Sequence, residues 1–424
     1  MKIPEKIRAN LLLKMTSLNG VVIAIRLLFS IFIQRLLAQM LGETGVSKIG
    51  QFRNLTNMLV SFSSLGIFNG VVKYVAEYKE DQKQLQRLFS TSFLFVLIGS
   101  LCSFVILFCG ASIISEYLFA TTNFTYVIKI LSICIPFIGI QRVFNGVING
   151  LSAYKRLAKI ELISYLLSSL LTVIFLYLYN IDGVLVAIAI APIIQLITLL
   201  FVFFKVLKEY MSFSTLKLSR VFSKNLFGFV LMSFCSTILL NYVEIGIRST
   251  LIQQISEHDA GVWTAMTNIS KNYMVFSGAI FSMYVLPKFS SIKLKKDFKK
   301  ELIYIYKTLL PLFALGMLLV YLCREWIVNL IYPNFEGLET LFKWQLMGDF
   351  MKLASVVLAH QFLAKKLVAN FIITEILSLV LFYGFSYYLI PIFGIKGVVI
   401  SHLIRYIIYG LVVFLMVNRY FDKD

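Results

Sequence analysis

Charged residues are scarce in this chain, and acidic residues are scarcer than basic ones. Only 14% of the 424 residues are charged, with 21 acidic against 40 basic residues. A soluble protein carries roughly a quarter of charged residues, so this composition excludes a soluble globular protein. Hydrophobic residues make up 59% of the chain, and apolar runs of about 20 residues recur along it, which predicts a polytopic helical membrane protein.

Metal, disulfide and nucleotide signatures are also missing. The five cysteines all lie inside apolar runs, and none has the C-x-x-C spacing of a metal or redox site. The three histidines, His258, His360 and His402, lie far apart in the sequence. No G-x-x-x-x-G-K-[ST] run is present, so no ATP site is expected. The net charge of +19 is interpreted as loop charge that sets topology, and no nucleic-acid partner is expected.

What the chain does contain is a series of apolar spans separated by charged loops. We predict twelve spans, at roughly 11–40, 48–76, 86–110, 124–150, 158–180, 183–205, 224–252, 259–287, 300–322, 337–363, 367–391 and 395–418. One set of alternating loops holds 24 basic residues, and the other holds only Lys48, Arg324, Lys343 and Lys396. Basic loops face the cytoplasm, so both termini are expected inside the cell.

The two halves of the chain repeat each other. Gly50-Gln-Phe52 followed by Leu55-Thr56-Asn57 matches Gly261-Val-Trp263 followed by Met266-Thr267-Asn268, 211 residues later in a chain of 424. Glu161 and Ser164 match Glu375 and Ser378 at an offset of 214. We therefore predict two parallel six-helix lobes, as in alternating-access transporters. The lobes are expected at 1–205 and 224–424, joined by a cytoplasmic linker at 206–223.

Several charges lie within the predicted spans, and most of them are positive. The basic residues within the spans or at their ends are Lys14, Arg26, Arg35, Arg53, Lys73, Lys129, Arg142, Arg248, Lys271, Lys307, Lys352 and Arg405. Carboxylates are fewer, so the cations cannot all be paired, and a central charge costs about 2.5–3.5 kcal/mol even on lenient scales. This surplus predicts a water-filled, electropositive cavity that suits an anionic substrate.

Helical phase selects candidates among these charges. Residues three, four or seven positions apart share one face of a helix. In the second span Arg53 and Asn57 share a face; in the eighth, Thr267, Asn268 and Lys271 do; in the tenth, Gln345, Asp349 and Lys352 do. Arg53, Lys271, Asp349 and Lys352 lie deep within their spans, which favours a functional role over a position near the lipid headgroups.

Four motifs resemble a known family. They are GIFNGVVKYVAEY at 66–78, GVW at 261–263, FSMYVLP at 281–287 and WQLMGDFMK at 344–352. They resemble the Wzx-type flippases of O-antigen and of enterobacterial common antigen (lipid III), within the multidrug/oligosaccharidyl-lipid/polysaccharide exporter superfamily. The resemblance implies outward transfer of an undecaprenyl-pyrophosphate-linked oligosaccharide across the bacterial inner membrane, by alternating access through a cationic central cavity. It also implies work beside a polysaccharide polymerase and a chain-length regulator.

The same resemblance implies roles for particular residues. Pyrophosphate handling falls on Arg26, Arg35, Arg53, Arg248, Lys271 and Lys352, with Asp349 as their partner. The neutral polar residues beside them, Asn57, Thr267, Asn268 and Gln345, suit sugar hydroxyls. No cofactor is expected, because an inside-negative membrane potential favours outward movement of negative charge. Coupling to H⁺ or Na⁺ stays open, with Asp349 as its candidate.

Three other functions compete with this prediction. A cation-coupled multidrug exporter of the same superfamily would need a cavity dominated by carboxylates, which the cationic surplus argues against. A membrane polymerase or glycosyltransferase would need a sizeable catalytic loop, and the longest periplasmic connection, about 323–336, is short. A passive lipid scramblase stays open.

Overall fold

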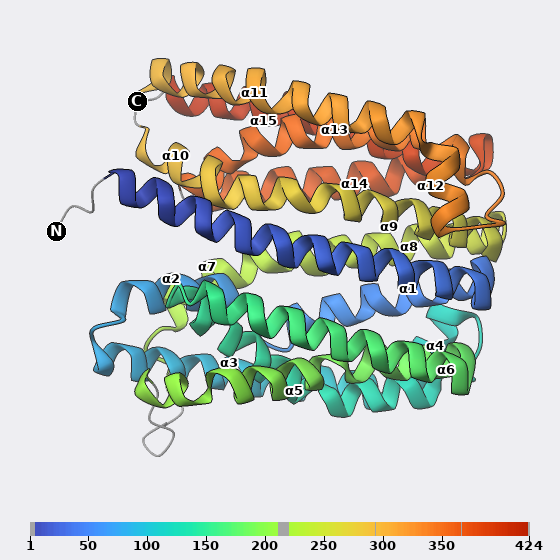
Figure 1. The fold of residues 1–424 in the computed structure, drawn as a ribbon, viewed down its shortest axis with the longest axis horizontal. Helices are drawn as coiled ribbons and strands as arrows, with labels where there is room; N and C mark the ends of the chain where they lie inside the picture. The colour runs from blue at the N-terminus through green and yellow to red at the C-terminus, as the bar shows by residue number, and fades with distance from the viewer. Residues whose placement is uncertain (1–4, 211–219, 293, 366, 423–424) are drawn as a thin grey trace. The chain divides into compact units, whose positions relative to one another are not determined.

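A computed structural model of the protein describes residues 5–210, 220–292, 294–365 and 367–422 (Figure 1). Within these ranges the chain is helical, and it contains no strand. In chain order, the helices are α1 (Glu5–Phe62), α2 (Phe68–Tyr78), α3 (Gln82–Cys109), α4 (Ala111–Phe119), α5 (Thr125–Gly150), α6 (Tyr154–Tyr210), α7 (Ser223–Ser233), α8 (Leu240–Gln254), α9 (Glu257–Ile280), α10 (Leu286–Ser291), α11 (Lys295–Leu322), α12 (Arg324–Ile331), α13 (Leu338–Ala364), α14 (Val368–Phe393) and α15 (Lys396–Phe421). Short π-helical turns, Phe234–Leu239 and Phe281–Val285, precede α8 and α10.

Eight helical segments of the described chain are long and apolar enough to cross a membrane. They confirm the prediction of a polytopic helical membrane protein. Two of the eight, in α1 and α6, contain a break where the backbone leaves the helical region, at Gly42 and Asn180. Helices α9 and α13 have 24 and 27 residues but are not among the eight apolar segments. The predicted number of twelve spans stays a prediction.

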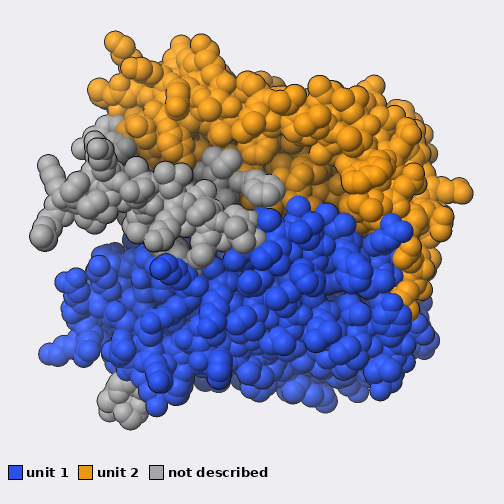
Figure 2. All heavy atoms as spheres, in the orientation of Figure 1, with its two compact units in different colours: residues 1–36, 52–238 blue, residues 37–51, 239–424 orange. Residues whose placement is uncertain are grey.

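The chain forms two compact units, coloured separately in Figure 2. Unit 1 comprises residues 1–36 and 52–238, and unit 2 comprises residues 37–51 and 239–424. The middle of α1 therefore belongs with the C-terminal helices. The predicted lobe boundaries at 205 and 224 stay a prediction, and residues 211–219 of the predicted linker lie outside the described residues.

In unit 1, glycines let α5 pack closely against α2. A Cβ atom at Gly146 would lie 3.0 Å from Val71 Cγ1, and one at Gly150 would lie 2.7 Å from Val75 Cβ. The spacing of these two glycines, four residues apart, is typical of close helix packing in membranes. The contact buries Val71 and Val75 completely or nearly so.

Backbone geometry supports the sequence repeat. Asn180 has φ 51° and ψ −133°, and Gly394 has φ 60° and ψ −145°. These two residues lie 214 positions apart, the same offset as the Glu161 and Glu375 motifs. A non-glycine residue rarely adopts positive φ, so the shared conformation indicates that both halves turn in the same way before their last helix.

Candidate functional site

Unit 2 contains a cavity of about 250 Å³ that is lined by α8, α9, α13, α14 and α15. Five predicted site residues line it, namely Thr267, Lys271, Gln345, Asp349 and Lys352. They come from α9 and α13, where the predicted spacing of three and four residues places them on one face of each helix. The polar faces read from the sequence therefore meet in one place within this unit.

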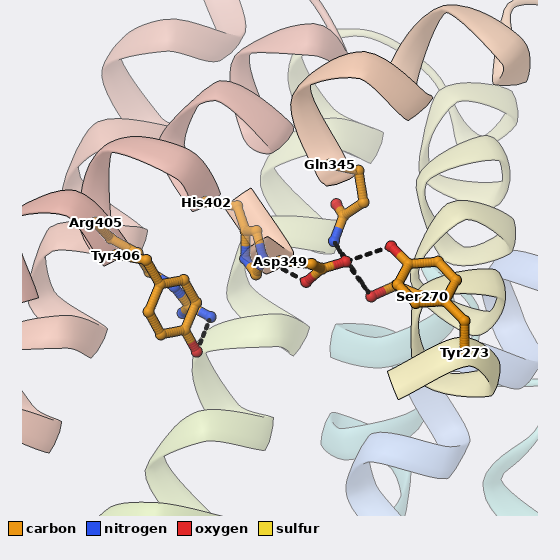
Figure 3. A network of polar contacts seen from close by, with 7 residues as sticks. All are labelled: Ser270, Tyr273, Gln345, Asp349, His402, Arg405 and Tyr406. Carbon is orange, nitrogen blue, oxygen red and sulfur yellow. Dashed lines mark hydrogen bonds and ion pairs between the residues drawn. The ribbon is translucent and has the colours of Figure 1, made fainter. Parts of the chain in front are cut away.

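The carboxylate of Asp349 is the centre of a hydrogen-bond network (Figure 3). Asp349 is fully buried at 0% exposure. Its Oδ1 lies 2.9 Å from Nε2 of His402 on α15. Its Oδ2 accepts hydrogen bonds from Ser270 Oγ at 2.6 Å, Tyr273 OH at 2.5 Å and Gln345 Nε2 at 3.1 Å. Three helices thus share one carboxylate, whose charge is stabilised by four donors.

The other carboxylates at this cavity also have partners. Glu244 Oε2 lies 3.5 Å from Lys271 Nζ, and Glu375 Oε1 accepts a hydrogen bond from Tyr409 OH at 3.2 Å. Asp349, by contrast, has His402 as its hydrogen-bond partner, and it forms no ion pair with Lys352 among the described residues. The implied partnership of Asp349 with the lysines and arginines stays a prediction, and the partner found here is a histidine of α15 that the sequence prediction did not use.

Arg405 on α15 also lines this cavity, although the sequence prediction did not select it. Its guanidinium carbon lies 4.0 Å from the ring centre of Phe382 and 4.4 Å from that of Tyr406. Nη2 donates to the hydroxyl of Tyr406 at 3.0 Å (Figure 3). The side chain is only 4% exposed. The available signal was its spacing of three residues from His402, which places both on one helical face.

Two predicted residues of this unit lie outside the cavity lining. Arg248 is 2% exposed and donates from Nε to Thr264 Oγ1 at 2.8 Å and from Nη1 to Gln51 Oε1 at 3.2 Å. It thereby ties the middle of α1 to α8 and α9. Asn268 donates from Nδ2 to the hydroxyl of Tyr332 at 3.3 Å.

Unit 1 contains a second polar cavity, of about 570 Å³. The predicted residues Arg26, Arg53 and Asn57 line it, and the predicted residue Arg35 does not. Arg26 Nη1 lies 3.0 Å from Glu161 Oε2, and both side chains are 40% exposed. The cavity therefore presents two arginines and one carboxylate to the space between its helices.

Residues at matching repeat positions line the two cavities. Thr56 and Thr267 are 211 residues apart, whereas Glu161 and Glu375, like Ser164 and Ser378, are 214 apart, and all six line the cavity of their own unit. The residues that line the two cavities differ on the last helix of each half. At the offset of 214, His402 and Arg405 stand where the first half has Ile188 and Ala191.

Known proteins match most of this chain. Residues 12–293 match the family described as "Polysaccharide biosynthesis protein". Proteins named "Lipid III flippase" from Escherichia coli (strain K12) and from Shigella flexneri are each 29% identical over 386 residues, which cover 89% of this chain and 91% of theirs. These relatives confirm the resemblance inferred from the motifs.

Solved structures share the fold at low sequence identity. The lipid II flippase MurJ in an inward closed conformation superposes with a TM-score of 0.74 at 17% identity, over 94% of this chain and 87% of that one. A multidrug resistance MATE family transporter of the MOP superfamily superposes in its inward-facing conformation with a TM-score of 0.71 at 15% identity, over 96% and 95% of the two chains. A multidrug resistance MATE family transporter of the MOP superfamily in an outward-facing conformation gives a TM-score of 0.67 at 16% identity, over 95% of each chain. Because the family match spans more than half of the sequence, the chain belongs to the polysaccharide biosynthesis protein family.

Proposed function

We propose that this protein is a flippase that moves a lipid-linked oligosaccharide from the cytoplasmic to the periplasmic leaflet by alternating access. The observation that carries the proposal is a polar cavity with basic residues in its wall in each unit. Each cavity is lined by several helices, some of which are long and apolar enough to cross a membrane. A phosphate group that leaves water needs charged hydrogen-bond partners. The protein is a transporter and has no enzymatic role in this proposal.

The substrate that we propose is an undecaprenyl-pyrophosphate-linked repeat unit of O-antigen or of enterobacterial common antigen. The support is the name of the relatives, lipid III flippase, at 29% identity over most of the chain. The lipid tail stays in the bilayer, and the cavities receive the polar headgroup. We further propose that the protein works in the bacterial inner membrane beside a polysaccharide polymerase and a chain-length regulator.

Two six-helix lobes with both termini in the cytoplasm are the proposed topology. Eight apolar segments, the breaks at Gly42 and Asn180, and the additional helices α9 and α13 are compatible with twelve spans. The excess of basic residues in alternate loops supports the orientation.

Residue roles follow from the placement of side chains. Arg26 and Arg53 in unit 1 and Lys271 and Lys352 in unit 2 line cavities and are proposed to meet the pyrophosphate. Asn57, Thr267 and Gln345 are proposed to meet sugar hydroxyls. Arg35, Arg248 and Asn268 do not line either cavity, and any contact with substrate would require another conformation of the transporter.

The coupling ion is proposed to be a proton held by Asp349 and His402. Both oxygens of Asp349 already accept hydrogen bonds, so coordination of Na⁺ would have to displace several donors. A histidine beside a carboxylate can take up a proton without such displacement. The facing groups are Lys352 on α13, Arg405 on α15, Glu244 and Lys271 on α8 and α9, and Glu375 on α14.

Complementation of a flippase-deficient strain tests the function. Wild type is expected to restore surface polysaccharide, and Arg53→Ala, Lys271→Ala and Lys352→Ala are expected to accumulate the lipid-linked intermediate at equal membrane expression. Lys343→Ala serves as the matched control, because Lys343 is an exposed residue of α13 that lies outside the cavity lined by Lys271 and Lys352 and instead lines a separate, largely apolar cavity. Export by the three variants at the wild-type level would contradict the role of the cations. Failure of wild type on every lipid-linked glycan would contradict the substrate class.

A cation-coupled multidrug exporter is the second candidate. Three carboxylates, Glu244, Asp349 and Glu375, line the cavity of unit 2, as an exporter of cationic drugs would require. Each of them already has a partner within unit 2, which favours the flippase. Resistance of a drug-sensitive strain on expression of the wild type would favour the exporter instead.

A further inference from the structure

Arg405 has an unused hydrogen-bond donor inside the cavity wall of unit 2. The side chain is 4% exposed, and its Nε has no hydrogen-bond partner among the residues that the structure describes. Burying a polar group without a partner is unfavourable, and burying a charge is more so. The aromatic rings of Phe382 and Tyr406 hold the guanidinium in place, so the unused donor has a fixed position.

No carboxylate of the described chain neutralises this arginine at close range. Neither Arg405 nor Lys352 has a carboxylate oxygen within 4.0 Å in the described part of the protein. The nearby carboxylates bond elsewhere, Asp349 to His402 and Glu375 to Tyr409. Two cations on the wall of one cavity are therefore without a close counter-charge.

The matching helix of the first half has no arginine at this position. Residue Ala191 occupies the corresponding position on the last helix of the first half, and it also lines the cavity of its own unit. The same type of helix thus packs with a methyl group at this position. A buried arginine that the equivalent helix does without is better explained by a ligand than by packing.

We infer that Arg405 and Lys352 form an oxyanion-binding subsite in the cavity of unit 2. Resting on the proposed function, the inference assigns the subsite one anionic group of the lipid-linked substrate, either its pyrophosphate or a carboxylate on its sugars. Both groups present oxygens that a planar guanidinium binds through paired donors, with lysine as a second point charge. A volume of about 250 Å³ is below the roughly 300–1,000 Å³ of drug-sized sites, which suits one group of the substrate.

A local reporter can test this subsite without transport. Trp263 lines the same cavity, and the chain has only three tryptophans. The full-length protein with Trp326→Phe and Trp344→Phe, in lipid nanodiscs, would therefore report occupancy of this cavity through Trp263 fluorescence. Inorganic pyrophosphate and glucuronate are titrated separately, so that the two arms distinguish a phosphate from a sugar carboxylate.

The expected result is a saturable change in Trp263 fluorescence with at least one of the two anions. Arg405→Gln and Lys352→Gln should each weaken its affinity about 10- to 100-fold, as expected for loss of a charged hydrogen bond. Arg405→Lys should fall between them and wild type, because it keeps the charge but loses the planar fork. Lys343→Gln, on the same helix as Lys352 but outside this cavity, should bind as wild type does.

Two results would overturn the inference. One is the absence of any saturable change with either anion in the wild-type background, and the other is equal affinity in wild type, Arg405→Lys and Lys352→Gln. Arg405→Lys keeps the test valid if Arg405→Gln does not fold. Flipping assayed in vesicles separates the two proposals: flipping without Arg405-dependent binding rejects only the subsite, and binding without flipping rejects only the proposed function.

Discussion

At the scale of single residues, the Asp349–His402 pair joins two helices through a fully buried carboxylate. His402→Ala would remove one of four donors and is expected to destabilise the protein by about 2 kcal/mol, within the range for a buried acceptor that loses a partner. Unfolding midpoints in detergent, compared with those of His402→Gln, measure this effect. Gln can restore a donor, so it should recover part of the loss.

A double-mutant cycle tells whether the two groups act together. Asp349→Asn combined with His402→Ala should show a coupling energy of about 0.5–3 kcal/mol, as residues in direct contact do. Simple addition of the two single effects would mean that the pair contributes no interaction of its own.

The Arg26–Glu161 pair should behave differently, because both side chains are 40% exposed. Exposed ion pairs contribute about 0–1 kcal/mol. Glu161→Gln is therefore expected to leave the unfolding midpoint nearly unchanged, whereas Arg26→Gln should impair export in the complementation assay at the same stability. A large loss of stability in Glu161→Gln would show that the pair is structural.

At the scale of helices, the close approach of α13 and α15 holds the Asp349 network together. A Cβ atom at Gly348 would collide with the ring of His402 and would lie 3.2 Å from the backbone nitrogen of Leu403. Gly348→Ala is expected to destabilise the protein by about 1–3 kcal/mol through overpacking. The same variant should also displace His402 from Asp349.

Gly384→Ala on α14 is the matched control for this substitution. Nothing lies within 4 Å of a Cβ atom at Gly384, and alanine is the better helix former by about 1 kcal/mol. The control should therefore be neutral or stabilising in the same detergent assay. Equal destabilisation by both variants would refute the packing explanation.

At the scale of the whole molecule, the distribution of basic residues predicts how the chain crosses the membrane. A green fluorescent protein fused after Asp424 should fluoresce, because the C-terminus is expected in the cytoplasm. Alkaline phosphatase fused after Phe335, between α12 and α13, should be active, because that loop is expected in the periplasm. Phosphatase fused after Lys296, at the basic N-terminal end of α11, should be inactive, and the reverse pattern would refute the orientation.

Much of the architecture could be predicted because it depends on local properties of the chain. Apolar length predicts a membrane-spanning helix, and a spacing of three and four residues predicts which side chains share a face. These rules placed Thr267 and Lys271, and likewise Gln345, Asp349 and Lys352, on the faces that line the cavity of unit 2. The repeat was also visible, since matched residues keep a constant offset.

Only the tertiary structure decided which of these faces meet. Helical phase identifies a face but not the neighbouring helix, so the pairing of Asp349 with a histidine 53 residues later could not be read from the sequence. The same limit concealed Arg405. It also concealed the partners of Arg248, whose predicted substrate role came from the family resemblance and whose guanidinium donates hydrogen bonds to Thr264 and Gln51. The sequence by itself determined the membrane-spanning helices, the repeat and the excess of cations, because these depend on composition and local spacing. The tertiary structure determined the partners of each charge, because those depend on contacts between helices that are distant in sequence.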